Sequence, residues 1–138
     1  MDTPRKSKAK VLIVDDQSEM RDFLRDVLEM LPVDILEAGD GLTAMNLIEA
    51  EQPDLLLSDY HMPNWDGLTL CHQLRGPAKN QDPAMKIVAS LKIVLITGET
   101  TEPVLLQAVN HGIVDAAFHK PVDAHELTRV IKRLLAFD

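Results

Sequence analysis

Short apolar runs alternate five times with segments of helical periodicity along this chain of 138 residues. The runs are rich in Val, Ile and Leu, and turn-forming or charged residues follow them, which is typical of buried strands. We predict strands at residues 11–14, 33–38, 55–58, 91–96 and 116–119. Because helices usually connect parallel strands, this alternation predicts an α/β fold, a five-stranded parallel sheet with helices on both faces.

The intervening segments carry apolar residues at helical spacing, and Pro or Gly follows several of their ends. We predict helices at residues 20–31, 42–51, 68–75, 103–112 and 123–135. Asp123 and Glu126 have the spacing of a capping box at the start of the last helix. The fourth strand has two candidate runs, Ile87-Val88 and Ile93-Val94, and the second is favoured because it leads directly to Thr97-Gly98.

Composition indicates one globular domain. The formal net charge of −8 disfavours binding to nucleic acid, and no apolar run approaches the roughly 20 residues that span a bilayer. No secretory leader is recognisable and the single cysteine, Cys71, cannot form an internal disulfide, so we expect a cytoplasmic location. We expect a flexible basic tail at residues 1–9, with the charge of Lys10 grouped with it, and one folded domain at residues 10–138.

Polar side chains follow four of the five predicted strands directly. They are Asp15 and Asp16 after the first, Asp59 after the third, Thr97 after the fourth and Lys120 after the fifth. Parallel strands deliver their carboxyl ends to the same edge of a sheet, which is also where open α/β sheets bind their ligands. We therefore expect these five side chains to gather at one site.

The residue types at this edge favour phosphoryl chemistry. Three carboxylates about 4 Å apart repel each other by several kcal/mol even at a high effective dielectric constant. A hard divalent cation offsets that repulsion, and a partly hydrated site of oxygen ligands suits Mg²⁺. Lys120 adds an ammonium group and Thr97 a hydroxyl, which together with a metal can hold a transferring phosphoryl group. Asp59 is then the predicted nucleophile, which would form an acyl phosphate.

These residues lie in motifs that resemble the receiver domain of bacterial two-component response regulators, most closely the single-domain, CheY-like chemotaxis type. The matching segments are Val14-Asp15-Asp16, residues 59–67 (DYHMPNWDG), Thr97-Gly98 and Lys120-Pro121. They extend over nearly the whole chain from Val11 onward. The resemblance implies a flavodoxin-like, doubly wound sheet with strand order 2-1-3-4-5 and five helices.

The resemblance also implies roles for the site residues. Asp59 would accept a phosphoryl group from a sensor histidine kinase or a histidine phosphotransfer protein, and Thr97 and Lys120 would contact that group. The Lys120–Pro121 peptide bond would be cis. Such a domain catalyses only its own phosphorylation and dephosphorylation, so we expect no enzyme that acts on a separate substrate.

The metal ligands are likewise implied by the resemblance. Mg²⁺ would be bound by Asp15, Asp16 and Asp59, together with the backbone carbonyl of His61. Phosphorylation would switch the conformation, and a downstream protein, an output domain or a second copy of the chain would recognise the fourth helix, fifth strand and fifth helix. Both a stand-alone regulator and a receiver within a longer protein fit the sequence. We expect neither nucleic acid nor a membrane among the direct partners.

Two features depart from the family pattern. The position three residues before the lysine usually holds Tyr or Phe, and here it is Ala117, followed by Phe118. Neighbouring strand residues point to opposite faces of a sheet, so Phe118 replaces the missing ring only if a bulge shifts the register by one residue. The segment at residues 76–92 is also longer than the usual connection. We therefore expect output to travel through backbone shifts and the position of the fourth helix.

Three other classes of protein share parts of this pattern. A flavin-binding electron carrier has the same topology, but Asp15 and Asp16 would repel the flavin phosphate. A phosphatase of the haloacid dehalogenase type uses a strand-end Asp, but its Asp-x-Asp signature is missing because Gln17 follows the acidic pair. A pseudo-receiver, an interaction module without phosphotransfer, is the third alternative, although every active-site position is filled.

Overall fold

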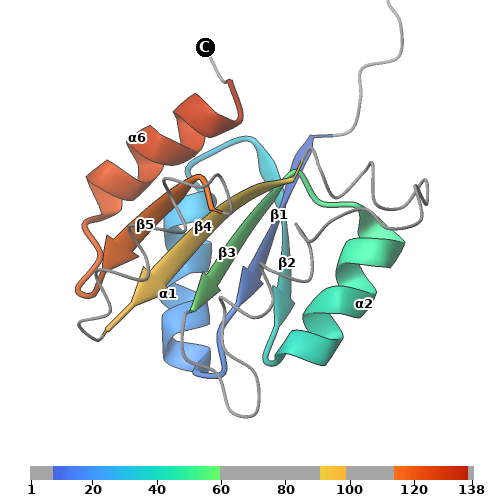
Figure 1. Ribbon diagram of the computed structural model, residues 1–138. Helices are drawn as coiled ribbons and strands as arrows, with labels where there is room; N and C mark the ends of the chain where they lie inside the picture. The colour runs from blue at the N-terminus through green and yellow to red at the C-terminus, as the bar shows by residue number, and fades with distance from the viewer. Residues whose placement is uncertain (1–7, 60–90, 99–113, 137–138) are drawn as a thin grey trace, which may run out of the picture.

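A five-stranded parallel sheet forms the centre of the described part of the molecule (Figure 1). The computed structural model describes residues 8–59, 91–98 and 114–136. The strands are β1 (Ala9–Val14), β2 (Val33–Ala38), β3 (Leu55–Asp59), β4 (Lys92–Thr97) and β5 (Ala116–His119). Their order is β2-β1-β3-β4-β5, which confirms the flavodoxin-like arrangement and places the fourth strand at the Ile93-Val94 run.

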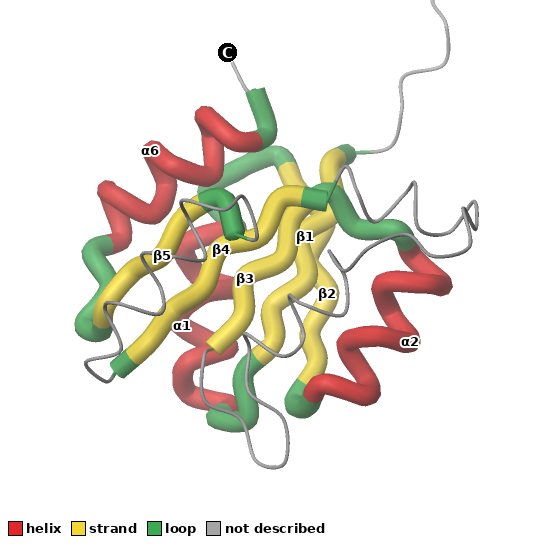
Figure 2. Tube along the Cα trace, viewed as in Figure 1, coloured by secondary structure: helices red, strands yellow, loops and turns green. Residues whose placement is uncertain are grey.

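Helices cover both faces of the sheet (Figure 2). The helices among the described residues are α1 (Ser18–Leu28), α2 (Gly41–Glu51) and α6 (Ala124–Leu134). α1 and α6 lie side by side on one face and α2 covers the other. The helices predicted at residues 68–75 and 103–112 lie outside the described residues. Within the described ranges, no helix is both long and apolar enough to cross a membrane.

The central strands are buried on both faces. Val11 and Ile13 of β1 pack towards α1 and α6, while Leu12 and Val14 pack towards α2, and all four are fully buried. Double-sided burial explains why these strands are continuous apolar runs without alternation. Each buried Val, Leu or Ile side chain stabilises the fold by roughly 1.5–3 kcal/mol. The residues that follow β1 and β3 are therefore held by the best-packed part of the molecule.

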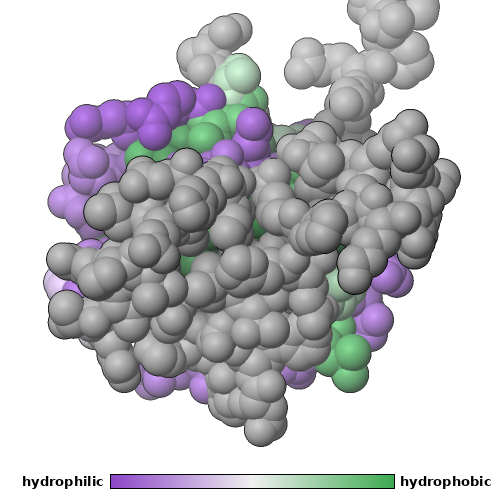
Figure 3. Space-filling view, viewed as in Figure 1, coloured by the Kyte–Doolittle hydropathy of each residue, from purple (hydrophilic) through white to green (hydrophobic). Residues whose placement is uncertain are grey.

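Side-chain caps begin two of the helices. Asp40 accepts a hydrogen bond from the backbone N–H of Thr43 at 2.7 Å, and Asp123 accepts one from that of Glu126 at 3.0 Å. These hydrogen bonds lower the pKa of both carboxyl groups. The contact of Asp123 confirms that the final helix starts where the sequence predicted. Figure 3 shows the hydrophilic outer side of this helix, α6, with apolar residues beneath it towards the sheet.

The first strand begins earlier than predicted. Ala9, the last residue of the expected tail, already belongs to β1, and so does Lys10. The Lys10 side chain is not part of a solvated basic arm, because its ammonium group contacts Glu51 Oε1 at 3.0 Å. Pairing with β2 also starts at Ala9. Ala9 and Lys10 therefore belong to the strand because their backbones pair with β2, which their side chains do not indicate.

β5 has a regular register. Residues 94–97 of β4 pair in order with residues 116–119, so Ala117 lies opposite Leu95 and Phe118 opposite Ile96. Phe118 is half-buried and packs against the cluster shared by α1 and α6, whereas Ala117 is exposed. The expected register is confirmed. The ring of Phe118 therefore points to the face opposite the one that Ala117 occupies.

Candidate functional site

The carboxyl edge of the sheet brings together the side chains that the sequence singled out. Asp15 follows β1, Asp59 ends β3, Thr97 ends β4 and Lys120 follows β5. Three of these residues are buried, with 1% of Asp15, 6% of Asp59 and none of Thr97 exposed to solvent. Polar groups at such depth are costly to bury unless they have partners, so their presence at one edge points to a binding site.

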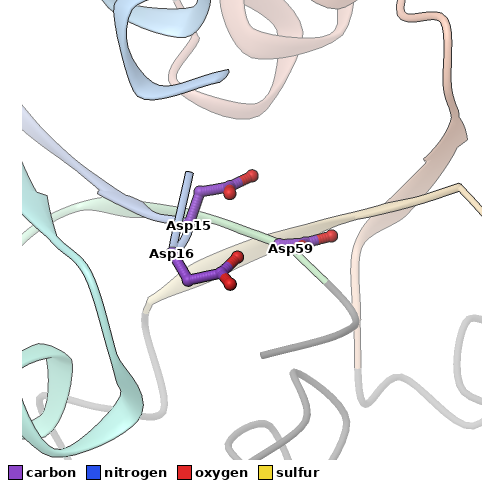
Figure 4. A group of neighbouring side chains, drawn as sticks. All are labelled: Asp15, Asp16 and Asp59. Carbon is purple, nitrogen blue, oxygen red and sulfur yellow. The ribbon is translucent and has the colours of Figure 1, made fainter. Parts of the chain in front are cut away.

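Three carboxylates form the centre of this edge (Figure 4). Asp15 and Asp16 extend from the end of β1 and Asp59 from the end of β3, and their oxygen ligand atoms lie within 4.8 Å of one another. Asp16 is exposed, so the group is open to solvent on one side. Two oxygens on opposite sides of one Mg²⁺ lie about 4 Å apart, so small side-chain rotations would let the three carboxylates share a cation.

The environment of Asp15 disfavours its negative charge. Burial raises the pKa of this carboxyl group to about 6, and repulsion from Asp59 and Asp16 acts in the same direction. The backbone N–H of Gln17, which donates to Asp15 Oδ1 at 2.8 Å, and the ammonium group of Lys120 both lower the pKa and offset part of this effect. A bound cation would stabilise the ionised form, so the donor set and its charge fit a hard divalent metal.

Lys120 lies beside the central carboxylate. Its Nζ is 3.6 Å from Asp59 Oδ1, and its backbone N–H donates to the carbonyl of Thr97 at 2.7 Å. That second contact joins the loop after β5 to the end of β4. The Lys120–Pro121 peptide bond is cis, as the resemblance to receiver domains implied. In the strand order, Asp15 and Asp16 follow β1 on one side of β3, whereas the ammonium group comes from the residue after β5 on the other side.

Supporting contacts were not predicted from the sequence. Arg21 Nη1 donates to the backbone carbonyl of Asp15 at 2.6 Å, and Ser58 Oγ donates to that of Asp59 at 3.0 Å. Ser58 carries a weak signal, because it is a hydroxyl in an otherwise apolar run. Arg21 carries none, because an arginine on the polar side of a helix is ordinary. The remaining predicted ligand, the carbonyl of His61, lies outside the described residues.

Comparison with known proteins identifies the family. Residues 11–132 match the family described as the response regulator receiver domain. The chain belongs to this family. Receiver domains act in two-component systems, and acceptance of a phosphoryl group on an aspartate is their general function. The predictions of family, fold and two-component function are therefore confirmed, and the flavodoxin-type carrier and the phosphatase are set aside.

Relatives include several larger regulators. RpfG, a cyclic di-GMP phosphodiesterase response regulator of Xanthomonas campestris pv. campestris, is 35% identical over 91% of this chain and 31% of its own length. The sensor histidine kinase TmoS of Ectopseudomonas mendocina is 32% identical over 92% of this chain and 12% of its own length. The response regulator MprA of Mycobacterium tuberculosis is 30% identical, and this chain spans 50% of it. The chain is thus similar to one part of each of these proteins.

A solved structure shares the fold along nearly its whole length. The CheY-like response regulator receiver domain protein from Methanospirillum hungatei has a TM-score of 0.78 and 27% identity, covering 94% of this chain and 95% of the other. The signal receiver domain of an HD domain-containing protein from Pseudomonas fluorescens gives the same values. Both are receiver domains, so the structural likeness agrees with the family match.

Proposed function

We propose that Asp59 is the residue that receives the phosphoryl group, from a sensor histidine kinase or a histidine phosphotransfer protein. One observation carries this assignment. Asp59 is the member of the acidic cluster that also has the Lys120 ammonium group beside it, at 3.6 Å from Oδ1. Asp59 is 6% exposed and ends a fully buried strand, so packing restricts the directions that its carboxylate can take. A fixed carboxylate next to a positive charge is suited to act as a nucleophile.

Asp15, Asp16 and Asp59 would hold Mg²⁺, with the backbone carbonyl of His61 as a further ligand. Receiver domains bind Mg²⁺ through acidic residues, and the closeness of these three carboxylates supports the assignment. When bound, the cation would neutralise the carboxylates and draw charge from the phosphoryl oxygens, as metal ions generally do in phosphoryl transfer. The role of the three aspartates is to orient their oxygens towards one point before the donor arrives.

The transfer forms one bond and breaks another. A carboxylate oxygen of Asp59 attacks the phosphorus of the donor phosphohistidine, and the phosphorus–nitrogen bond breaks as the oxygen–phosphorus bond forms. The bonding electrons stay on the imidazole nitrogen, which takes a proton from the solvent and leaves as neutral imidazole. Lys120 stabilises the charge on the phosphoryl oxygens, and Thr97 donates a hydrogen bond to one of them. Hydrolysis of the acyl phosphate restores Asp59, so the chain catalyses only its own modification.

The phosphorylated state would be recognised through the helix predicted at residues 103–112, together with β5 and α6. The Lys120 N–H to Thr97 carbonyl contact supports this route, because it couples the ends of β4 and β5. Since Ala117 carries no ring, the signal would pass through backbone and helix position. The partner would be a downstream protein, an attached output domain or a second copy of the chain. We expect the reaction in the cytoplasm, because that is where a histidine kinase has access to ATP.

The test is phosphorylation by acetyl phosphate with Mg²⁺, followed by intact mass. The wild-type chain should gain one phosphoryl group and Asp59→Asn none. Asp34→Asn, which removes an exposed carboxylate near the other end of the sheet, should behave as wild type. Labelling of Asp59→Asn, or labelling in excess chelator, would contradict the assignment. A wild-type chain that is not labelled by acetyl phosphate or by any histidine kinase would instead be a pseudo-receiver.

A further inference from the structure

Two arginines and a glutamate join α1 to β2 beside the acidic cluster. Glu37 Oε1 accepts from Arg21 Nε at 3.3 Å, and Glu37 Oε2 accepts from Arg25 Nε at 2.7 Å and also contacts Arg25 Nη2. All three side chains are partly buried. Arg21 makes one contact beyond this network, the hydrogen bond from its Nη1 to the carbonyl oxygen of Asp15. Arg21 therefore links the network to the candidate metal site.

The Asp15 carbonyl belongs to the peptide group that joins Asp15 to Asp16. Because a peptide group is planar, a contact that fixes its oxygen also fixes the direction of the bond that leads to Asp16. Asp15 itself makes two other hydrogen bonds. Its backbone N–H donates to the Ala38 carbonyl at 3.1 Å, and its Oδ1 accepts from the backbone N–H of Gln17 at 2.8 Å. Asp16 itself is exposed and is not held by packing. The orientation of Asp16 therefore depends on the Asp15–Asp16 peptide group, to whose oxygen Arg21 donates.

We propose that Arg21 is a positioning residue for divalent-cation binding, which fixes the Asp15–Asp16 peptide and with it the directions of the two carboxylates. The inference rests on the proposed function, because the cation is the Mg²⁺ of that site. Arg21 acts through the backbone of Asp15, since its guanidinium group donates to the Asp15 carbonyl oxygen and to Glu37. Outer contacts that orient metal ligands typically contribute 10- to 100-fold to metal affinity.

Charge and positioning predict opposite effects of removing Arg21. Loss of a positive charge near three carboxylates would by itself strengthen binding of a cation. Loss of the carbonyl contact would weaken it, because the carboxylates would then sample directions that do not meet. Arg25 provides the matched control, since it carries the same charge and contacts the same Glu37 but is not the donor to the Asp15 carbonyl.

The experiment is a calorimetric titration of the full chain with Mg²⁺ alone, near neutral pH and at constant ionic strength. Arg21→Gln should bind Mg²⁺ about 10-fold more weakly than wild type, in line with other outer contacts of metal ligands. Arg25→Gln should stay within about twofold of wild type or bind slightly more tightly, since a screened charge has little effect. Urea unfolding confirms that each variant is folded during the titration.

Three outcomes would overturn the inference. One is an Arg21→Gln chain that binds Mg²⁺ as well as wild type, and another is an equal loss in both variants, which would assign the effect to the Glu37 network as a whole. The third is a wild-type chain without Mg²⁺ binding, which would overturn the proposed function as well. If Arg21→Gln does not fold, Arg21→Lys takes its place. A single ammonium group cannot reproduce the planar fork, so weaker binding is again expected and wild-type affinity would contradict the inference.

Discussion

The sheet holds charged groups in opposite ways at its amino edge, where the strands begin, and at its carboxyl edge, where the strands end. At the amino edge, carboxylates meet hydrogen-bond donors. Lys10 Nζ contacts Glu51 Oε1 at 3.0 Å, the Lys10 N–H donates to Asp54 Oδ2 at 2.8 Å, and the Ile93 N–H donates to Asp115 Oδ2 at 2.8 Å. Each contact joins a strand to the segment that precedes a neighbouring strand. These charges stabilise the fold in the ordinary way.

At the carboxyl edge, carboxylates meet each other. Asp15, Asp16 and Asp59 bring their oxygens within 4.8 Å, and two of the three are buried. Lys120 offsets part of the repulsion, yet the pKa of Asp15 is still raised. One sheet therefore carries both arrangements. The mutually repelling carboxylates lie where the strand order reverses, which is the place where open α/β sheets generally bind ligands.

The largest expected difference between the edges is a dependence on pH. The pKa of Asp15 is about 6 in the folded chain, above the ordinary value of 3.8 for such a group, so between these values the folded state binds more protons than the unfolded state. Without metal, the contribution of this group to stability is fully present below about pH 4 and is lost as the pH rises through about 6. The loss amounts to about 3 kcal/mol. Urea unfolding across this range measures it.

Two controls sharpen this prediction. Asp15→Asn should remove the loss, because the side chain no longer ionises, and saturating Mg²⁺ should remove or reverse it. The capping residues Asp40 and Asp123 have lowered pKa values, so their contributions are present above about pH 4 and disappear only in stronger acid. If the stability of the metal-free wild-type chain rose steadily from pH 4 to pH 7, ionisation of Asp15 would not be the unfavourable step described here.

A smaller effect is expected for Lys120→Ala. Removal of the ammonium group leaves Asp59 without that ion pair, so the metal-free chain should lose about 1 kcal/mol of stability. The variant should still bind Mg²⁺, because the three carboxylates remain. Its response to phosphorylation, followed by NMR shifts in β4 and β5, should be much weaker than in wild type. An exposed lysine on α6, Lys132, provides the control, and a full response in Lys120→Ala would refute the coupling.

The smallest effect is expected at the amino edge. Glu51→Gln removes the partly exposed ion pair with Lys10, whose ammonium group keeps its hydrogen bond to the Glu51 carbonyl. Unfolding in urea should show a loss of about 0.5 kcal/mol that shrinks at high salt, and Mg²⁺ affinity should not change. A loss as large as that caused by ionisation of Asp15 would show that the two edges do not differ in the way described.

The sequence predicted what depends on local pattern. Apolar runs located the five predicted strands, and the Asp123–Glu126 spacing located a helix start. Residues directly after strands identified the side chains that gather at the carboxyl edge. It did not predict contacts between a side chain and a distant backbone group. Arg21 reaches the Asp15 carbonyl because α1 folds back beside β1, and nothing in the spacing of an arginine on a polar helix side reports that. The entry of Lys10 into β1 was missed for the same reason, since pairing with β2 decides it.

The position at which the chain enters the sheet has a practical consequence. β1 starts at Ala9 on the amino edge, and the acidic cluster follows its last residue, so the strand separates the two by roughly 20 Å at about 3.3 Å per residue. A fusion partner or surface linker joined ahead of Ala9 would therefore leave the molecule from the end away from Asp59. A chain immobilised in this way would present its carboxylates to a soluble kinase, which makes surface-based measurement of phosphorylation rates straightforward to design.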